Sequence, residues 1–530
     1  MDNEIVIGLI APLGCDKEYF LDKIKHEFKS REHAVEVITV TDLIFQRVEN
    51  KYPKSFTIFA KMEICSLLRK NYKGAVAVLI IEEIIKRGNK NTDKKVVYII
   101  DQLKNESDCK VLSHVYGLNY TQLSLYSNEI QRDRNLSDRI RSDQDTKHTF
   151  NPKQNEHLIK SLVVDDFLKK EIIHSIKSIK NYNMYNDYQN QISSDVTHCL
   201  IEKDYKETQE SHGASGQQFS KIFHKSDYFF NLDVDKSSIA KELEKFVMQL
   251  FGEYKDYPTQ DEYGMAVAYD TAFRSNFPGE RHIGAAIIGL NGEIISTGSI
   301  RAPNKSSNTN VMHQDSVASG YDRYKNDIKT WIEWMGNVKL AESDASLKEK
   351  NDSCIKNIQN FLNDSIDFHP CTHAEIAALL DAAKAGVSVM NATLYTTTFP
   401  CHLCAKDIIS AGVSKVVYIE EYPKSKSKTL YPTIIDLNSQ NKKDVIPFQL
   451  FSGVSPNRYH RVYSLENKPS ESDRNQESEI FPSIVSPYLR YENRKYYRLR
   501  EEDVCRHFSE YLNENKSGNL DYLDNLLKRH

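Results

Sequence analysis

The sequence lacks any run of about 18 apolar residues, the length that a membrane-spanning helix needs. The apolar stretch 5–14 near the start follows acidic residues instead of basic ones, so we expect a buried strand there and not a signal peptide. Without a span or a secretory signal, the chain is expected in the cytoplasm and without a membrane partner.

An excess of one charge is also missing. The chain has 70 basic and 74 acidic residues, a net charge of −4, so its overall charge does not indicate binding to nucleic acid. Its nine cysteines are odd in number and irregularly spaced. This pattern argues against a disulfide framework and indicates a reducing compartment.

With 530 residues the chain is long enough for two or three domains, each with its own core. We expect the first over residues 1–255, with a polar insertion at about 142–203. The second is expected over 256–465. A polar linker and a basic, aromatic C-terminal tail then occupy 466–530.

The first domain begins as a P-loop does, with an apolar run at 5–10, a glycine turn and a helical stretch at 19–28. Gly14 and Lys17 lie in that turn, and Asp101 ends a second apolar run, where a Walker B strand carries its carboxylate. These three residues are the candidate nucleotide-binding residues of this domain.

The P-loop pattern is nevertheless degenerate. Aligned on Lys17, its two glycines become Ala11 and Asp16, and its magnesium-binding hydroxyl becomes Glu18, an acid that would repel phosphates. We therefore expect a degenerate P-loop, nucleoside-kinase-like α/β domain that senses nucleotides or is purely structural, instead of transferring phosphate. Four arginines between 132 and 141 fit a lid over phosphates or, as is usual for a charge run, a solvated helix face.

The strongest chemical signal is His373-Ala374-Glu375 followed by Pro400-Cys401-His402-Leu403-Cys404. The first part opens a helix-forming run that Gly386 closes, and the second stands between a β-type run at 392–397 and another helix. A helix N-terminus carries partial positive charge and lowers the pKa of a thiol. Both cysteines are therefore favoured as thiolates.

One imidazole and two thiolates are typical of catalytic zinc, because His373, Cys401 and Cys404 leave the fourth tetrahedral position to water. Glu375 stands two residues from the histidine, where it can take a proton from that water and pass it to a leaving amine. A redox Cys-x-x-Cys pair would leave the His-x-Glu without a role. A closed structural site, with Cys371 as a fourth ligand, stays open as an alternative.

The second domain reads as a mixed sheet with helices packed on it. A helix is expected at 262–275, a β-hairpin around Asn291-Gly292, and a strand at 416–419 after the cysteine helix. In the tail, arginines and tyrosines interleave between Tyr488 and Arg500. This patch could hold nucleic acid, but such a patch is more often an oligomer contact or an amphipathic helix.

These residues resemble the deoxycytidylate deaminases, whose His-x-Glu and Pro-Cys-x-x-Cys pattern marks zinc deaminases of nucleobases. With the degenerate P-loop, the chain is most similar to the long, two-domain bacterial anti-phage dCTP deaminases. The resemblance covers about residues 1–140 and 200–465. The segments that carry it are 373–375, 398–406, 408–412, 281–286, 422–425 and 451–454.

The resemblance implies zinc-dependent hydrolysis of dCTP, dCMP or both to deoxyuridine nucleotides and ammonia, which depletes dCTP as an antiviral defence. His373, Cys401 and Cys404 would hold Zn²⁺, and Glu375 would shuttle protons. The backbone at Ala374 would lie against the base.

Further substrate contacts are expected from Arg274, Asn304 and Lys424. The chain departs from the family at Ile300, where an asparagine is usual, and Asn304 is the candidate to replace it. The resemblance also implies a homo-oligomer such as a hexamer, a regulatory nucleotide at the N-terminal domain, and an inhibitory small RNA. Two other functions stay open, namely deamination of cytosine in single-stranded nucleic acid and nucleotide sensing with a structural zinc site.

Overall fold

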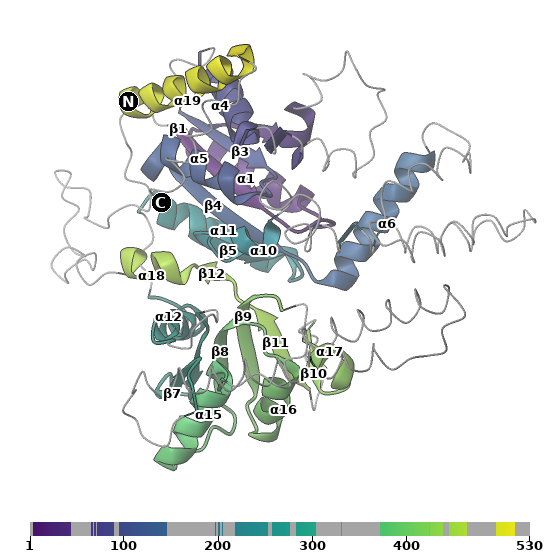
Figure 1. Ribbon diagram of the computed structural model, residues 1–530, viewed down its shortest axis with the longest axis vertical. Coiled ribbons are helices and arrows are strands. Elements are labelled where there is room, and N and C mark those ends of the chain that lie inside the picture. The colour runs from purple at the N-terminus through teal and green to yellow at the C-terminus, as the bar shows by residue number, and fades with distance from the viewer. Residues whose placement is uncertain are drawn as a thin grey trace, which may run out of the picture. The chain divides into compact units, whose positions relative to one another are not determined.

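The structure is a computed structural model of the chain, shown in Figure 1. It divides into two compact units, one of Met1–Tyr257 with Ser452–His530 and one of Pro258–Phe451. The structure describes residues 4–43, 65–66, 68–69, 72–89, 95–145, 197, 200–201, 204, 218–252, 257–275, 282–303, 330, 371–422, 425–437, 445–463 and 494–514.

This division differs from the expected one on its C-terminal side, where we placed 256–465 in the second domain and 466–530 in a separate tail. Strand β12 (Gly453–Val454) pairs antiparallel with β5 (Tyr228–Asn231) of the first unit. Helix α18 (Pro456–Val462) follows, and its Arg458 forms an ion pair with Asp227. A two-residue strand carries no periodicity, so the sequence could not reveal this return.

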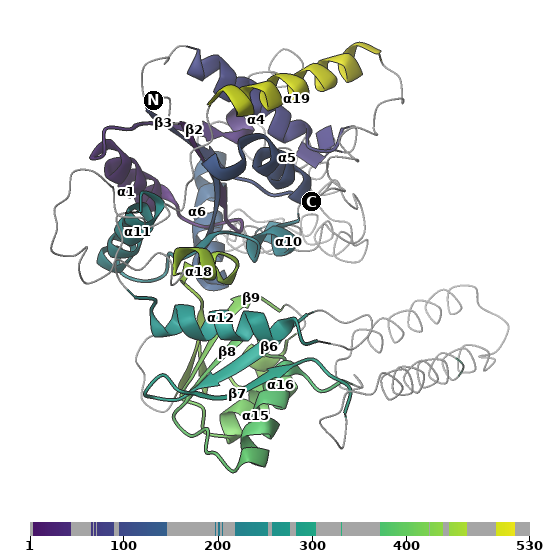
Figure 2. The same ribbon diagram turned by 90° about the vertical axis from the view of Figure 1, so that its left-hand side faces the viewer.

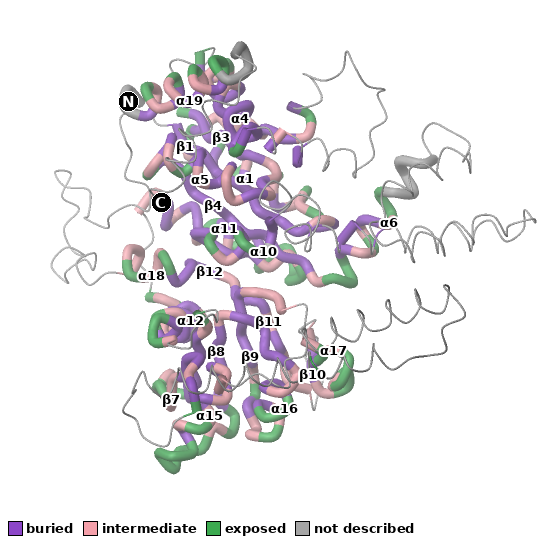
Figure 3. Tube along the Cα trace, in the orientation of Figure 1, coloured by how far each residue is buried: buried purple, intermediate pink, exposed green. Residues whose placement is uncertain are grey.

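The first unit is built on a six-stranded sheet in the order β12-β5-β4-β1-β3-β2, in which every pairing except that of β12 is parallel. Every residue of β1 is buried, which confirms the prediction of a strand covered on both faces. Figure 3 shows the same burial along the central strands. The remaining strands are β1 (Glu4–Ile10), β2 (Ala34–Thr39), β3 (Val96–Asp101) and β4 (Tyr120–Tyr126).

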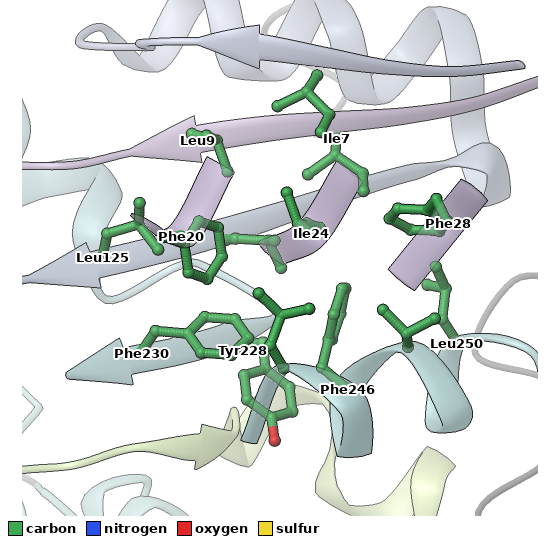
Figure 4. Packing of buried hydrophobic residues seen from close by; sticks show 14 of the residues in the cluster. Ile7, Leu9, Phe20, Ile24, Phe28, Leu125, Tyr228, Phe230, Phe246 and Leu250 are labelled. Atoms are coloured by element: carbon green, nitrogen blue, oxygen red, sulfur yellow. The ribbon is translucent and has the colours of Figure 1, made fainter. Parts of the chain in front are cut away.

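Helices cover both faces of this sheet, as the turned view in Figure 2 shows. One face packs against α1 and α11 through an apolar cluster in which the rings of Phe20 and Phe230 meet edge to face, 4.9 Å between centroids. Figure 4 shows this cluster from close by. The helices of the unit include α1 (Glu18–Lys29), α4 (Ala75–Gly88), α5 (Glu106–Tyr116), α6 (Glu129–Asp145), α10 (Phe219–Phe223) and α11 (Lys236–Leu250).

The described part of the C-terminal tail is helix α19 (Arg494–Glu514), which contacts α4 and α5 of the first unit. Tyr497 is fully buried and its hydroxyl donates to Glu4 Oε2 at 2.6 Å. The Arg500 guanidinium donates to the carbonyl oxygen of Val115 at 2.7 Å. Tyr497 and Arg500 of the basic, aromatic patch therefore pack a helix against the first unit. Tyr488 and Tyr491 of the same patch lie outside the described residues.

The second unit is built on a mixed six-stranded sheet in the order β10-β11-β9-β8-β6-β7. The predicted hairpin is confirmed, because β6 and β7 pair antiparallel and Gly292 in their turn has φ +85°. The strands are β6 (Gly284–Ile288), β7 (Ile294–Ser299), β8 (Thr393–Thr398), β9 (Lys415–Glu420), β10 (Ile435–Asp436) and β11 (Ile446–Leu450). The helices include α12 (Gln260–Ala272), α15 (Ala374–Ala385), α16 (His402–Ser410) and α17 (Ser427–Leu430).

Close backbone contact sets the position of α15 against the sheet. A Cβ at Gly298 of β7 would lie 2.1 Å from the carbonyl oxygen of Ala374 and 2.4 Å from the nitrogen of Ala378. Only glycine therefore lets the first turn of α15 approach β7 this closely. The helix start, where His373 lies, is fixed by this contact.

Within the part of the chain that the structure describes, no helix has the length and apolar composition needed to cross a membrane.

Candidate metal centre

The predicted ligands occupy the starts of two helices that contact each other, α15 and α16. His373 is the N-cap residue of α15, and the helix ends at Gly386 with φ +69°, as predicted. Cys401 is the N-cap residue of α16, which follows β8, and Cys404 lies in its first turn. Both halves of the sequence signature are thus placed at helix N-termini, and at one of them the Cys401 sulfur accepts a backbone N–H, that of Cys404.

The three ligand atoms converge on one point. His373 Nδ1 lies 3.3 Å from Cys401 Sγ and 3.3 Å from Cys404 Sγ, and the three atoms all lie within 4.8 Å of one another. A tetrahedral zinc ion places its nitrogen and sulfur ligands about 3.5 Å apart. The donor set and its spacing therefore fit zinc.

Glu375 lies beside this group without being one of its members. Its side chain is buried, with 4 % exposed, and its Oε2 lies 3.6 Å from Cys404 Sγ. Burial raises the pKa of the Glu375 carboxyl to about 6. A carboxyl of this kind can both accept and return a proton near neutral pH.

Hydrogen bonds among the ligand side chains shift their pKa values in opposite directions, so Cys401 alone is favoured as a thiolate, and not both cysteines as expected. Hydrogen bonds from Cys404 and His373 lower the pKa of Cys401 to about 4, and its sulfur accepts the backbone N–H of Cys404 at 3.4 Å. The hydrogen bond with Cys401 together with burial raises the pKa of Cys404, since a second thiolate would be repelled by the first. Burial alone would lower the pKa of His373, but hydrogen bonds with Cys371 and Cys401 raise it to about 11.

Cys371, the fourth ligand of the closed-site alternative, lies near the centre. It makes a side-chain hydrogen bond with His373. Among the described residues, however, the group whose ligand atoms converge consists of His373, Cys401 and Cys404 alone.

The expected substrate residues are placed unevenly. Ala374 is fully buried in the first turn of α15, whereas Arg274 is exposed just beyond the end of α12. Asn304 and Lys424 lie outside the described residues. Ile300 is buried with Ala302 in a small apolar cluster, so the side chain that replaces the usual asparagine serves packing here.

Two supports of the centre were not identified from the sequence. Arg301 pairs by backbone hydrogen bonds with Thr372, next to His373, and its guanidinium makes two hydrogen bonds to Asp381 of α15 at 3.1 and 2.7 Å. On the cysteine side, the hydroxyls of Ser425 and Ser427 lie against the carbonyl of Pro400. Neither support could be recognised from a local sequence motif, because the residues in contact are 25 or more positions apart in the chain.

The candidate nucleotide-binding residues of the first unit gather at the turn between β1 and α1. Lys17 forms an ion pair with Asp101 and donates to Gln102 Oε1 at 3.3 Å. Gly14 has φ +87°, and a Cβ there would lie 2.4 Å from the carbonyl oxygen of Arg132. Nucleotide binding by these residues stays a prediction, because the Lys17 ammonium is paired with the Asp101 carboxylate.

A further carboxylate holds the same turn. Asp204 accepts the backbone N–H of Leu13 at 2.7 Å and pairs with Lys104 at 2.7 and 2.8 Å. Asp204 lies in the segment after the expected insertion, 191 residues from Leu13. No pattern in the sequence could have predicted this contact.

The arginines expected in a lid or on a solvated helix face lie in α6. Arg132 is buried, while Arg134 and Arg139 are exposed, as expected for a solvated helix face.

The part of the chain that holds these residues is similar in sequence to known deaminases. The family model for the cytidine and deoxycytidylate deaminase zinc-binding region matches residues 258–420. The deoxycytidylate deaminase of Enterobacteria phage T2 is 50% identical over 54 residues, which are 10% of this chain and 29% of that protein. The human deoxycytidylate deaminase is 25% identical over 193 residues, 36% of this chain and 83% of that protein.

Among solved structures, the chain is similar to the dCMP deaminase of cyanophage S-TIM5 in complex with dCMP and dUMP. The identity is 20%, the match covers 37% of this chain and 98% of that one, and the TM-score is 0.22. The chain spans less than a third of the length of the first curated relatives that it matches. Zinc, named in the description of the matched family, is the metal that the His/Cys/Cys group fits.

Proposed function

We propose an activity for the second unit on the premise that its residues 258–420 belong to the deoxycytidylate deaminase family. The reaction is hydrolytic deamination of a deoxycytidine nucleotide. Water adds to C4 of cytosine, the C4–N4 bond breaks, and the products are the deoxyuridine nucleotide and ammonia. His373, Cys401 and Cys404 would hold the zinc.

The observation that carries this proposal is the position of Glu375. A buried carboxyl beside three convergent metal ligands, but not one of them, is the arrangement that proton transfer at a catalytic zinc site needs. Zinc, when bound, supplies the Lewis acidity that makes water nucleophilic at neutral pH.

The chain's own residues move the protons. Glu375 accepts the proton that the water loses and delivers it to N3 of the base. It then takes the proton of the hydroxyl now bonded to C4 and passes it to the N4 amine as the C4–N4 bond breaks. The pKa of about 6 lets the carboxyl take part in both directions, because neither its charged nor its neutral form is strongly disfavoured at neutral pH. The buried surroundings of Glu375 and Cys404 keep bulk water away from this exchange.

The finer parts of the proposal rest on the sequence resemblance. They are the use of dCTP as well as dCMP, depletion of dCTP in antiviral defence, a regulatory nucleotide at the first unit, an inhibitory small RNA, and assembly into homo-oligomers such as hexamers. The motifs that support them are the degenerate turn after β1 and the segments on either side of the zinc signature.

The test is a product assay with several substrates. Zinc-loaded full-length chain is incubated with dCMP, dCTP, CTP and a cytosine-containing single strand of DNA or RNA, and the products are separated by chromatography. We expect uracil nucleotide and an equal amount of ammonia from dCMP, dCTP or both. Turnover only on the single strand would replace the proposal by deamination of nucleic acid. No turnover on any substrate, with zinc bound, would favour the structural-zinc alternative.

A further inference from the structure

The carbonyl group of Pro400, directly before the ligand Cys401, is held by two serine hydroxyls. Ser425 Oγ lies 2.8 Å and Ser427 Oγ 3.1 Å from the carbonyl oxygen. The two hydroxyl oxygens lie 2.7 Å apart, and Ser427 is fully buried. Two hydroxyl protons thus serve three close oxygen pairs, so either serine alone can still donate to Pro400.

This carbonyl controls the direction in which the chain enters Cys401. The Pro400 oxygen and the Cys401 nitrogen belong to one planar peptide group, so a fixed oxygen fixes the N–Cα bond of the cysteine. Cys401 is the N-cap residue of α16, with its backbone extended at φ −63° and ψ 165°. From that position its sulfur reaches His373 Nδ1 and the N–H of Cys404.

The segment 425–428, which contains both serines, also contacts Phe399, the residue before Pro400. The Lys428 ammonium lies 5.3 Å from the centroid of the Phe399 ring, which packs edge to face on Tyr418 with 4.9 Å between centroids. The Phe399 N–H donates to the carbonyl oxygen of Glu420 at 2.7 Å. The two residues before Cys401, Phe399 and Pro400, are therefore held in place by the end of strand β9 and by the start of α17.

We propose that Ser425 and Ser427 are positioning residues of the zinc centre, which hold the Pro400 peptide so that Cys401 is presented to the metal in its binding geometry. This inference rests on the proposed zinc site, since it assigns a role toward that metal. A purely structural role would lower the stability of the fold and leave zinc affinity unchanged. The proposal requires zinc affinity to change.

The test uses the full-length chain and measures zinc, independently of catalysis. Zinc affinity is measured by competition with a chromogenic chelator, and the rate of zinc release in chelator excess is measured on the same samples. For the double variant S425A/S427A we expect zinc affinity to fall by about 10- to 100-fold, the range seen when groups that orient metal ligands are removed. S425T, which keeps a hydroxyl at a half-buried position, is expected to retain affinity within about twofold.

The matched control is S410A. Ser410 also donates its hydroxyl to a carbonyl, that of Lys406 at 2.8 Å, but it lies at the far end of α16. S410A should keep wild-type zinc affinity. Wild-type affinity in S425A/S427A would overturn the proposal, and so would an equal loss in S410A. If the double variant does not fold, the single variants decide. With one donor to the Pro400 carbonyl instead of two, S425A and S427A should each release zinc faster than S410A, and release at the S410A rate from both would overturn the proposal.

This experiment also separates the two proposals. A wild-type chain that binds zinc tightly but deaminates no nucleotide would refute the proposed function and leave the serine proposal standing. A wild-type chain that binds no zinc would overturn both.

Discussion

At the scale of single residues, the ligand histidine and the first ligand cysteine share one backbone position, the N-cap of a helix. This position explains why the sequence signature was informative. A Cys-x-x-Cys pair at a helix start places both sulfurs at the first turn, and a His-x-Glu pair at another start places the carboxylate in the first turn of that helix. The convergence of His373, Cys401 and Cys404, with Glu375 beside them, was therefore predictable from the spacing of these residues.

The supporting residues were not predictable in the same way. Gly298, Arg301 and Ser427 act on His373 or Cys401 through contacts between distant segments of the chain. A glycine in a strand indicates a close approach but does not say what approaches. A serine in a short loop has many possible partners.

Gly298 gives a prediction at this scale. In G298A the new Cβ would meet backbone atoms of Ala374 and Ala378, which cannot rotate away. We expect the free energy of unfolding to fall by about 1–3 kcal/mol, the usual cost of overpacking, and zinc affinity to fall because His373 adjoins the displaced turn. Urea unfolding and chelator competition measure the two effects.

G284A is the matched control. Its Cβ would meet backbone atoms of Ala268 and Ala272 in α12, a similar clash with a helix that carries none of the proposed metal ligands. It should lose stability to a similar degree while keeping more of its zinc affinity than G298A does. Wild-type zinc affinity in G298A would contradict the role given to this contact.

At the scale of elements, long periodic or apolar segments were predicted well. The buried strands β1 and β3, the hairpin β6–β7 and the helix α15 all follow from runs of five or more residues with clear ends. Short elements were missed because they carry no period. Strand β12 has only two residues and is recognised by its pairing with β5. The turn between β1 and α1 is held by Asp204, which is remote from it in the sequence.

Asp204 gives the prediction at this scale. In D204A the Lys104 ammonium loses its partner in a site where Lys104 has 12% and Asp204 1% of its side chain exposed. Removal of one member of a buried ion pair costs about 3–5 kcal/mol, because the remaining charge is left without compensation. The Leu13 N–H loses its acceptor as well. We therefore expect D204A to lower the free energy of unfolding by about 3 kcal/mol, measured by urea denaturation with circular dichroism.

The control for this prediction is K225A. Lys225 pairs with Glu106 at 2.7 Å, but half of its side chain is exposed, so its loss should cost less than about 1 kcal/mol. Equal unfolding free energies for D204A and K225A would show that Asp204 does not hold the turn.

At the scale of the whole molecule, the chain has two units, and the first includes residues from both ends. The mixed sheet of the second unit was predictable, since its strands and helices alternate along a continuous stretch. The assignment of residues after 452 to the first unit was not, because it depends on the contacts of Tyr497 and Arg458 with residues more than 200 positions away. The function proposed for the molecule belongs to the second unit, where the proposed zinc ligands and Glu375 lie together.

The measurement that tests this account most directly compares the wild type with E375Q for nucleotide turnover and zinc content in the same preparation. The amide keeps the size of the side chain but cannot accept a proton, so we expect turnover of dCMP or dCTP to fall by about 10²- to 10⁴-fold while zinc stays bound. An E375Q variant that deaminates at the wild-type rate, or a zinc-loaded wild type that deaminates neither nucleotide, would contradict the account.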